Sequence, residues 1–199
     1  MKNLENKEAT AVLFLDLQKA FDTVNHDILL QKLYHYGVRG NAFLLLKSYL
    51  SGRKQRTKVK NAVSNLAFVL WGVPQGSVLG PLLFLIFIND LPNTSDLYSW
   101  LFADDTALAL SSNNIQELQI RFNHEVNKVH DWLLANRLSV HYKDKTKFMI
   151  IQGPSTKDRR TKSMNFKLHM GNHEIEKTDH YKYLGLLLDD KLNWKLQTN

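Results

Sequence analysis

The feature that most constrains this chain is a pair of adjacent carboxylates, Asp104 and Asp105, set between two apolar stretches. Residues 98–110 read YSWLFADDTALAL, and apolar positions alternate with polar or small ones on either side of the pair. This pattern predicts a β-hairpin with both carboxylates at its tip. Hairpin tips favour Asn-Gly or Asp-Gly, because glycine adopts positive φ without strain. Two like charges at such a tip therefore need a separate explanation.

Two explanations fit the pair. A cation held between Asp104, Asp105 and a third carboxylate would remove the repulsion, and Mg²⁺ is held in this way by carboxylates together with substrate phosphates. Alternatively the pair is an ordinary solvated turn, since turns are rich in Asp. Taken alone, the ordinary turn is the simpler interpretation. The rest of the chain has to decide.

Charge is unevenly placed along the chain. The 199 residues carry a net charge of +7, and no Asp or Glu occurs from residue 47 to residue 89. The first part of that stretch holds six cations: Lys47, Arg53, Lys54, Arg56, Lys58 and Lys60. A second basic concentration runs over residues 143–182. Segregated positive charge indicates a polyanionic partner, and a merely solvated basic face explains it equally well when charge is considered alone.

Several classes of protein are disfavoured. The chain has no cysteine, which excludes disulfides, thiolate zinc sites and a cysteine nucleophile. Residues 1–10 are polar and lack the apolar core of a signal peptide. The longest apolar run, residues 78–88, is too short to span a bilayer, and we expect it to form a buried helix. We therefore expect an intracellular protein, nuclear or cytoplasmic, that is not secreted and has no membrane partner.

A second carboxylate lies at the end of another strand. Residues 11–15 (AVLFL) are continuously apolar, as in a strand buried on both faces, and the run ends at Asp16. A carboxylate there is costly unless it has a partner or a cation. Adjacent strands could bring Asp16 and Asp104 together around two metal ions about 3.5–4 Å apart, the arrangement that serves phosphoryl transfer.

The other expected elements follow from periodicity, caps and turn residues. Asn25 caps a helix over 26–36 that ends at Gly37, and Asn114 with Glu117 begins a long amphipathic helix. Further helices are expected over 41–50 and 79–91, and strands over 148–151 and 181–188. We also expect a hairpin over 53–70 with its turn near Lys60 and Asn61, and a second hairpin over 166–175. Residues 72–77 are expected to form a loop and residues 153–163 a flexible linker.

Three motifs occur in a characteristic order: residues 14–22 (FLDLQKAFD), 72–77 (GVPQGS) and 102–105 (FADD). Together they resemble the first three palm motifs of reverse transcriptases, and their wording is closest to non-LTR (LINE-type) retrotransposons of the jockey and CR1 kind. The long helix followed by Lys143, Lys145, Thr146 and Lys147 resembles the fourth motif. Residues 183–185 (YLG) resemble the fifth, which lies near the primer terminus. Five motifs in order make the resemblance specific.

The resemblance implies roles for individual residues. Asp16 and Asp104 would ligate the catalytic Mg²⁺ ions (Mn²⁺ is possible), with Asp105 beside them and the carbonyl of Leu15 as a further ligand. Phe21 would be the steric gate that refuses a 2′-hydroxyl, although a core aromatic is the alternative for this residue alone. Nucleotide contacts would come from Gln75, Gly76 and Lys145. For Gly76 the alternative is a plain turn, and for Lys145 a solvated strand-edge lysine.

The resemblance also implies a fold and partners. We expect an α+β fold, a reverse transcriptase-like palm whose antiparallel sheet packs on helices, with a short C-terminal β-hairpin region. Residues 1–152 would form the palm, with helices and a hairpin inserted at 25–70, and residues 153–199 the linker, the fifth-motif hairpin and the start of a thumb. The partners would be an RNA template, a DNA primer and deoxynucleoside triphosphates. Nucleic-acid contacts would come from seven residues: Arg53, Lys54, Arg56, Lys58, Tyr183, Leu184 and Gly185.

Two functions are compatible with these residues. The first is an RNA-directed DNA polymerase, and the three carboxylates favour it. The second is a catalytically silent, basic nucleic-acid-binding relic of a retroelement. It is favoured by the expectation that the chain is a fragment without fingers, thumb and endonuclease, and that it does not polymerise alone. An RNA-dependent RNA polymerase is disfavoured, because Phe21 is bulky where such enzymes place a smaller polar residue.

The third motif departs from the family in one position. It begins with Phe102 where many relatives have tyrosine, so the hydroxyl is absent and the ring is kept.

Overall fold

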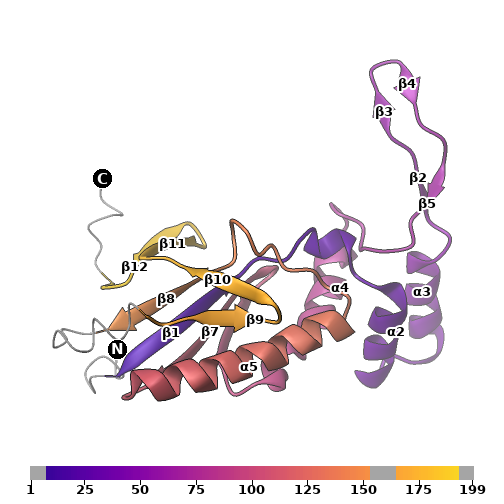
Figure 1. Ribbon diagram of the computed structural model, residues 1–199. Coiled ribbons are helices and arrows are strands. Elements are labelled where there is room, and N and C mark those ends of the chain that lie inside the picture. Colours follow the sequence, from indigo (N-terminus) through magenta and orange to yellow (C-terminus); the bar gives the residue numbers. More distant parts are fainter. Residues whose placement is uncertain (1–7, 153–164, 193–199) are drawn as a thin grey trace. The chain divides into compact units, whose positions relative to one another are not determined.

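The computed structural model of the chain describes residues 8–152 and 165–192 (Figure 1). The chain divides into two compact units. The first consists of Met1–Gln18, Leu91–Ala135 and Ser139–Asn199, and the second of Lys19–Asp90 and Asn136–Leu138. Helices and strands occur in both units, and the sheet of the first is mostly antiparallel, which is compatible with the expected α+β class.

The first unit is built on a six-stranded sheet in the order β6-β7-β1-β8-β10-β9. The strands are β1 (Ala9–Leu15), β6 (Tyr98–Phe102), β7 (Asp105–Ser112), β8 (Lys147–Gln152), β9 (Leu168–Met170) and β10 (His173–Lys177). β1 pairs antiparallel with both β7 and β8, whereas β10 pairs parallel with β8. Six of the seven residues of β1 are buried, so the predicted strand with two buried faces is confirmed.

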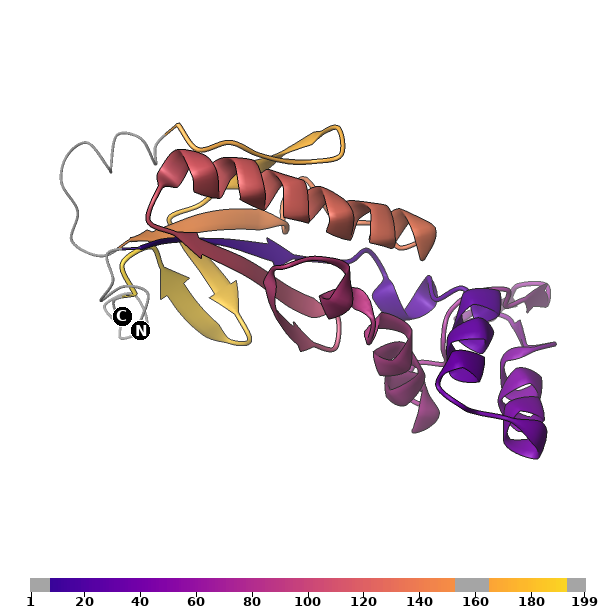
Figure 2. The ribbon, with the colours of Figure 1, turned by 90° about the horizontal axis from the view of Figure 1, so that it is seen from below.

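One face of this sheet is covered by α5 (Ile115–Ala135), as Figures 1 and 2 show. The helix begins where the sequence predicts, because the side-chain oxygen of Asn114 accepts hydrogen bonds from the backbone N–H groups of Gln116 and Glu117. Its buried apolar residues recur every three or four positions: Ile115, Leu118, Phe122, Val126, Val129 and Leu133. This spacing places them along one side of the helix, against the sheet.

A row of amide side chains on α5 pairs with the outer edge of β9, the last strand of the sheet. Gln119 Oε1 accepts from Lys167 N (3.0 Å), Asn123 Oδ1 from His169 N (2.8 Å) and Asn127 Oδ1 from Gly171 N (2.9 Å). Asn123 Nδ2 also donates to Lys167 O (2.9 Å). The acceptors are four residues apart on the helix and the donors are two residues apart on the facing chain. About one turn of the helix therefore corresponds to two residues of the strand. The outer edge of β9 is thereby closed.

The other face of the sheet carries a second hairpin, formed by β11 (His180–Tyr183) and β12 (Leu186–Asp189) (Figure 2). The single strand predicted over 181–188 is therefore wrong. The chain reverses at Leu184 and Gly185, whose φ angles are 49° and 83°. Gly185 takes this conformation without strain, which allows a two-residue turn inside a stretch that reads as one apolar run. The predicted hairpin over 166–175 is confirmed as β9 and β10.

The second unit contains α2 (His26–His35), α3 (Gly40–Leu50), α4 (Leu79–Ile88) and a short 3-10 helix, η1 (Ala20–Asp22). The side chain of Asn25 accepts from Ile28 N at 3.0 Å, so the predicted cap of α2 is confirmed. The helix expected over residues 78–88 is confirmed as α4, but it is buried on one side only. Val78, Leu82 and Leu85 are exposed, while the opposite side of α4 is buried.

A slender hairpin in the second unit extends away from α2 and α3 (Figure 1), and we call residues 53–70 the basic arm. It consists of β2 (Lys54–Gln55) paired with β5 (Ala67–Phe68) and β3 (Lys58–Val59) paired with β4 (Ala62–Val63). Lys60 has a φ of 53° at the tip, where the sequence predicts the turn. Almost every residue of the arm is exposed, including Val59, Leu66 and Phe68.

The predicted linker over 153–163 lies outside the described residues. After it, β10 extends the main sheet by pairing with β8. The domain boundary predicted between residues 152 and 153 stays a prediction. None of the helices in the described ranges has the length and apolar character that a membrane span requires.

The amide row on α5 generates a stability prediction. Replacing Asn123 by Ala removes both bonds to β9 and leaves Lys167 O and His169 N without these hydrogen bonds. We expect the free energy of unfolding to fall by about 1 kcal/mol and the amide exchange of His169 to accelerate. Urea unfolding and hydrogen exchange measure the two effects. Gln116→Ala, at an exposed position of the same helix, is the control, and equal changes in both variants would contradict the role of the row.

Candidate functional site

The predicted carboxylates lie at one end of the main sheet. The ladder between β1 and β7 ends with Leu15 opposite Thr106, so the next residues in register are Asp16 and Asp105. The ladder between β6 and β7 ends with Phe102 opposite Asp105. The turn between these strands therefore consists of Ala103 and Asp104. The predicted hairpin is confirmed, with Asp104 in its turn and Asp105 as the first residue of β7.

The turn holds its carboxylates on a strained backbone. Ala103 has a φ of 53°, a left-handed conformation that an alanine adopts at a cost of about 1–2 kcal/mol. Glycine would remove that cost, but the sequence has Ala103 immediately before the two carboxylates. Strain of this kind persists only where the surrounding structure enforces it, here through pairing of both flanking strands.

The carboxylates influence one another electrostatically. Burial raises the pKa of Asp105 above its ordinary value, and the negative charges of Asp104 and Asp16 raise it further. Lys145 acts in the opposite direction. The pKa of Asp105 thus records a cluster of three like charges with one cation in reach. Such a cluster attracts a cation more strongly than a single carboxylate in a turn would.

Lys145 reaches Asp16 from the loop that precedes β8. Its Nζ lies 3.5 Å from each carboxylate oxygen of Asp16. The backbone of Asp16 is tied to the same loop, because its N–H donates to Thr146 Oγ1 (3.2 Å) and its carbonyl accepts from His141 N (2.9 Å). The structure therefore brings Lys145 together with the carboxylates. Thr146, which is fully buried, belongs to the fourth-motif resemblance, but the sequence predicted no role for it.

The β11–β12 hairpin adds two tyrosines to this end of the sheet. The ring of Tyr181 stacks on Phe14 at 4.2 Å between centroids, and its hydroxyl donates to Lys145 O at 2.8 Å. Tyr183 packs on Phe14 at 5.6 Å, and its hydroxyl lies 3.4 Å from Trp100 O. Burial raises the pKa of both hydroxyls, with a further increase from Asp105. Of the residues selected from the sequence, Tyr183 lies in this hairpin, and Leu184 and Gly185 form its turn. Tyr181 was not selected.

The oxygen atoms of the site suit a hard cation. Asp16, Asp104 and Asp105 offer carboxylates, and Leu15 offers a backbone carbonyl, which are the ligands that Mg²⁺ and Mn²⁺ prefer. The repulsion that raises the pKa of Asp105 is what a bound cation would relieve. Across residues 8–152 and 165–192, no three His, Cys, Asp or Glu side chains form a group that could hold a metal ion. The donor atoms are thus of the kind that Mg²⁺ and Mn²⁺ prefer, but the described side chains do not by themselves form a group that could hold the ion.

The second unit contains the other predicted nucleotide contacts. Phe21 in η1 stacks on Phe84 of α4 at 4.5 Å and remains partly exposed. Residues 72–77 run beside η1, because Gly72 N donates to Val24 O and Val73 N to Phe21 O, both at 2.8 Å. A Cβ on Gly72 would lie 2.7 Å from Asp22 O, so only glycine permits this approach.

The polar end of the same loop is also held in place. Gln75 Nε2 donates to Asp22 Oδ1 at 2.8 Å, which links the loop to η1. Gly76 has a φ of 77°, and no atom lies within 4 Å of the position that a Cβ would take. The space beside its Cα is therefore open. The structure thus brings Phe21 and Gln75 into one neighbourhood through Asp22. Their roles toward a nucleotide stay predictions.

The four predicted phosphate contacts of the basic arm are all exposed. Lys54 lies over the ring of Phe68 at 4.7 Å, and Arg53 over Tyr49 at 5.6 Å. Neither these two nor Arg56 and Lys58 form an ion pair with any described residue. Their charges are therefore available to a polyanion.

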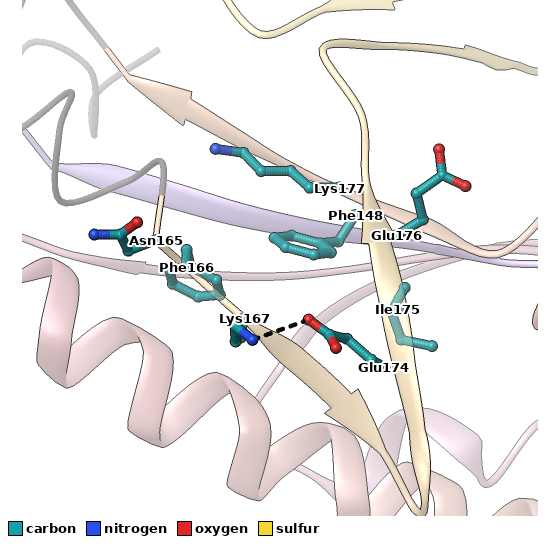
Figure 3. A pocket seen from close by; sticks show the side chains of 8 residues that line it. All are labelled: Phe148, Asn165, Phe166, Lys167, Glu174, Ile175, Glu176 and Lys177. Atoms are coloured by element: carbon teal, nitrogen blue, oxygen red, sulfur yellow. Dashed lines mark ion pairs between the residues drawn. The ribbon is translucent and has the colours of Figure 1, made fainter.

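A surface pocket of about 620 Å³ lies elsewhere in the first unit, between β8, β9 and β10 (Figure 3). Phe148, Phe166 and Ile175 form its apolar part. Lys167 and Glu174 face each other across its edge at 3.6 Å, and Glu176 and Lys177 complete the rim. Acidic and basic groups balance in this pocket, and none of its lining residues belongs to the predicted site.

The family described as "Reverse transcriptase (RNA-dependent DNA polymerase)" matches residues 1–188 of this chain. The chain is 31% identical, over 203 residues, to the RNA-directed DNA polymerase from mobile element jockey of Drosophila funebris, and the match covers 98% of this chain and 21% of that protein. It is 33% identical, over 202 residues, to the probable RNA-directed DNA polymerase from transposon X-element of Drosophila melanogaster, covering 96% of this chain and 20% of that protein. The chain therefore spans about a fifth of the length of the curated relatives it matches.

The repulsion at the site predicts a pH-dependent gain in stability for Asp105→Asn. Because the pKa of Asp105 is raised in the folded state, its ionised form destabilises the fold at neutral pH, and this penalty disappears as the pH falls through the raised pKa toward 3.8. We expect the variant to melt about 1–3 °C higher than the parent at pH 7 without added metal, and the difference to shrink with acidification.

Thermal melts from pH 7 down to pH 4 measure this difference. Asp144→Asn, which removes an exposed carboxylate from the loop before β8, is the control and should show no such trend. A variant that melts at or below the parent temperature at pH 7 would contradict the account of Asp105.

Proposed function

Because this chain belongs to the reverse transcriptase (RNA-dependent DNA polymerase) family, we propose that it carries the catalytic centre of an RNA-directed DNA polymerase of a non-LTR retrotransposon. The observation that carries this proposal is the grouping of Asp16, Asp105 and Lys145 at one end of a sheet, next to the strained turn that holds Asp104. In this proposal the first unit is the reverse transcriptase-like palm.

The carboxylates would hold two Mg²⁺ ions, or Mn²⁺, with the carbonyl of Leu15 as an additional ligand. Bound metal ions would supply charge stabilisation for the attacking and leaving oxygens of nucleotidyl transfer. Asp16 and Asp104 are the principal ligands in this assignment, and Asp105 keeps the local potential negative. The raised pKa of Asp105 supports the assignment, because the negative charges of Asp104 and Asp16 add to the larger effect of burial.

Four further residues would contact the nucleotide. Lys145 is suited to the departing pyrophosphate, since an ammonium placed beside the carboxylates can neutralise negative charge on phosphate oxygens. Phe21 would exclude the 2′-hydroxyl of a ribonucleotide, and its partly exposed ring on Phe84 is consistent with this role. Gln75 and the open side of Gly76 would lie along the template and the incoming nucleotide.

Two surfaces would hold nucleic acid. The basic arm presents Arg53, Lys54, Arg56 and Lys58 in a stretch of sequence without acidic residues, which suits the phosphates of an RNA template or of its duplex with DNA. The turn of the β11–β12 hairpin, with Tyr183, Leu184 and Gly185, would support the end of the DNA primer. The anchoring of that hairpin on Phe14, in the strand that ends before Asp16, supports this assignment.

Catalysis can be tested in a longer relative. We expect that the jockey polymerase of Drosophila funebris, with its matching segment replaced by residues 1–188 of this chain, extends oligo(dT) on poly(rA) with dTTP and Mg²⁺ or Mn²⁺. The same chimaera with Asp104→Asn is the blank, and it should be slower by at least about a hundredfold, because an amide is a much weaker metal ligand than a carboxylate. A chimaera that binds primer and template as the parent does, yet extends no better than this blank, would support the alternative of a silent nucleic-acid-binding relic.

Binding by the basic arm can be tested in the chain itself. We expect the double variant Arg56→Gln/Lys58→Gln to bind labelled oligo(rA) more weakly than the parent. The slope of log K against log salt should become shallower by about 0.7 for each phosphate that the arm no longer neutralises. Fluorescence anisotropy at salt concentrations from about 50 to 200 mM measures the slope.

The matched control is Arg121→Gln/Lys167→Gln, which removes the same charge from residues that pair with Glu117 and Glu174. Equal weakening in the two double variants would mean that net charge, and not the arm, determines binding.

A further inference from the structure

The position of Lys145 carries an inference that rests on the proposed function and goes beyond it. We propose that Lys145 is an internal counter-ion of the metal site, which neutralises Asp16 while no metal is bound and is displaced when a divalent cation binds. Tyr181 is the residue that positions Lys145 for this exchange. The proposal concerns how the chain keeps three clustered carboxylates folded together before metal arrives.

The charges at the end of the sheet are the first argument. The negative charges of Asp16 and Asp104 both act on Asp105, and a single described cation, Lys145, acts on Asp105 against them. The ammonium of Lys145 is equidistant from both oxygens of Asp16, at 3.5 Å. It therefore lies on the plane that bisects the two oxygens, as a cation bound equally to both of them also would.

The looseness of this contact is the second argument. Tight charge-assisted bonds between an ammonium and a carboxylate measure about 2.7–2.9 Å, so both distances here are long. The side chain of Lys145 is 57% exposed and that of Asp16 is 25% exposed. Water can therefore replace either partner, and the pair can separate without burying an unpaired charge. A divalent cation attracts the carboxylate more strongly than an ammonium does and has ready access to it.

The backbone beneath Lys145 is, in contrast, fixed. Its carbonyl accepts the hydrogen bond of Tyr181, whose ring is stacked within 6° of parallel on Phe14. The next residue, Thr146, is fully buried and accepts from Asp16 N. The side chain of Lys145 can thus move away from Asp16 while its Cα stays in place. After displacement, the ammonium remains within a side chain's length of the carboxylates.

The alternative is that Lys145 and Asp16 form a fixed structural ion pair. This alternative predicts the opposite change in metal affinity when Lys145 is removed. If Lys145 merely orders Asp16, its removal should disorder the site and weaken metal binding. If Lys145 competes with the metal, its removal should strengthen binding, because one positive charge beside the site is gone. We expect Lys145→Ala to bind Mn²⁺ on the order of tenfold more tightly than the parent chain.

Electron paramagnetic resonance of free Mn²⁺ measures Mn²⁺ binding to the 199-residue chain and shows whether removal of Lys145 strengthens or weakens it. Lys147→Ala is the matched control, because it removes a charge of the same sign from a residue that pairs with Glu176 at 3.1 Å. Its affinity should change little. In the Asp16→Asn background, Lys145→Ala should no longer tighten binding. An affinity that falls or stays the same in Lys145→Ala, while Asp16→Asn abolishes binding, overturns the proposal and leaves the proposed function intact.

Amine labelling of Lys145, quantified by mass spectrometry, tests displacement directly. Mn²⁺ should accelerate labelling of Lys145 relative to Lys143 at matched ionic strength, because the freed ammonium is no longer held by its carboxylate partner. Tyr181→Phe should accelerate the labelling of Lys145 in metal-free protein. Tyr183→Phe, whose hydroxyl faces Trp100 O instead, should leave that rate unchanged.

Labelling of Lys145 that is unaffected by both Mn²⁺ and Tyr181→Phe overturns the proposal. If no variant, including the parent, binds Mn²⁺ through Asp16, the metal site of the proposed function fails as well.

Discussion

The pairing of β1 with a neighbour on each side is the constraint on which the candidate site depends. Because β1 is antiparallel to both β7 and β8, its C-terminal end meets the N-terminal ends of both neighbours. Asp16 follows β1, Asp105 begins β7, and Lys145 lies just before β8. Three groups that are distant in sequence therefore arrive at one end of the sheet through strand direction alone. A slip of one residue in either ladder would move Asp16 to the opposite face and disperse the group.

The β11–β12 hairpin stabilises this arrangement through aromatic and hydroxyl contacts. Tyr181 and Tyr183 both pack on Phe14, two residues before Asp16, and their hydroxyls reach backbone carbonyls of the two flanking segments. One small hairpin thus contacts β1, the loop of Lys145 and the strand that leads to Asp104. Contacts of this kind are neutral, so they hold the site together without adding charge to a cluster whose potential is already negative. They also make the position of the turn at Leu184 and Gly185 depend on the same strand that positions Asp16.

Local signals in the sequence predicted most of the elements, and non-local packing accounts for what they missed. The cap at Asn114, the apolar run of β1 and the turn at Lys60 depend on neighbouring residues, and the structure has all three. Periodicity missed the reversal at Leu184, which only the family resemblance indicated, because a two-residue turn without Asn-Gly or Asp-Gly leaves no strong local signature. The exposure of Leu82 and Leu85 depends on what packs against α4, which hydrophobicity alone does not reveal. Lys145 and Thr146 were named only through the family resemblance, since the partner of Thr146 lies 130 residues away. Tyr181, whose partner lies 36 residues away, had no local signal at all.

The two functions proposed for this chain, metal binding and nucleic-acid binding, require opposite potentials, which explains the uneven distribution of its charge. Metal ions are attracted by concentrated negative charge, whereas the phosphates of a template are repelled by it. The end of the main sheet therefore concentrates three carboxylates within a chain whose net charge is +7. The basic arm concentrates cations over a stretch that lacks any acidic residue. Lys145 is the exception, a cation placed among the carboxylates. In the metal-free chain its ammonium lies 3.5 Å from both oxygens of Asp16, and in our proposal a metal ion takes over that role.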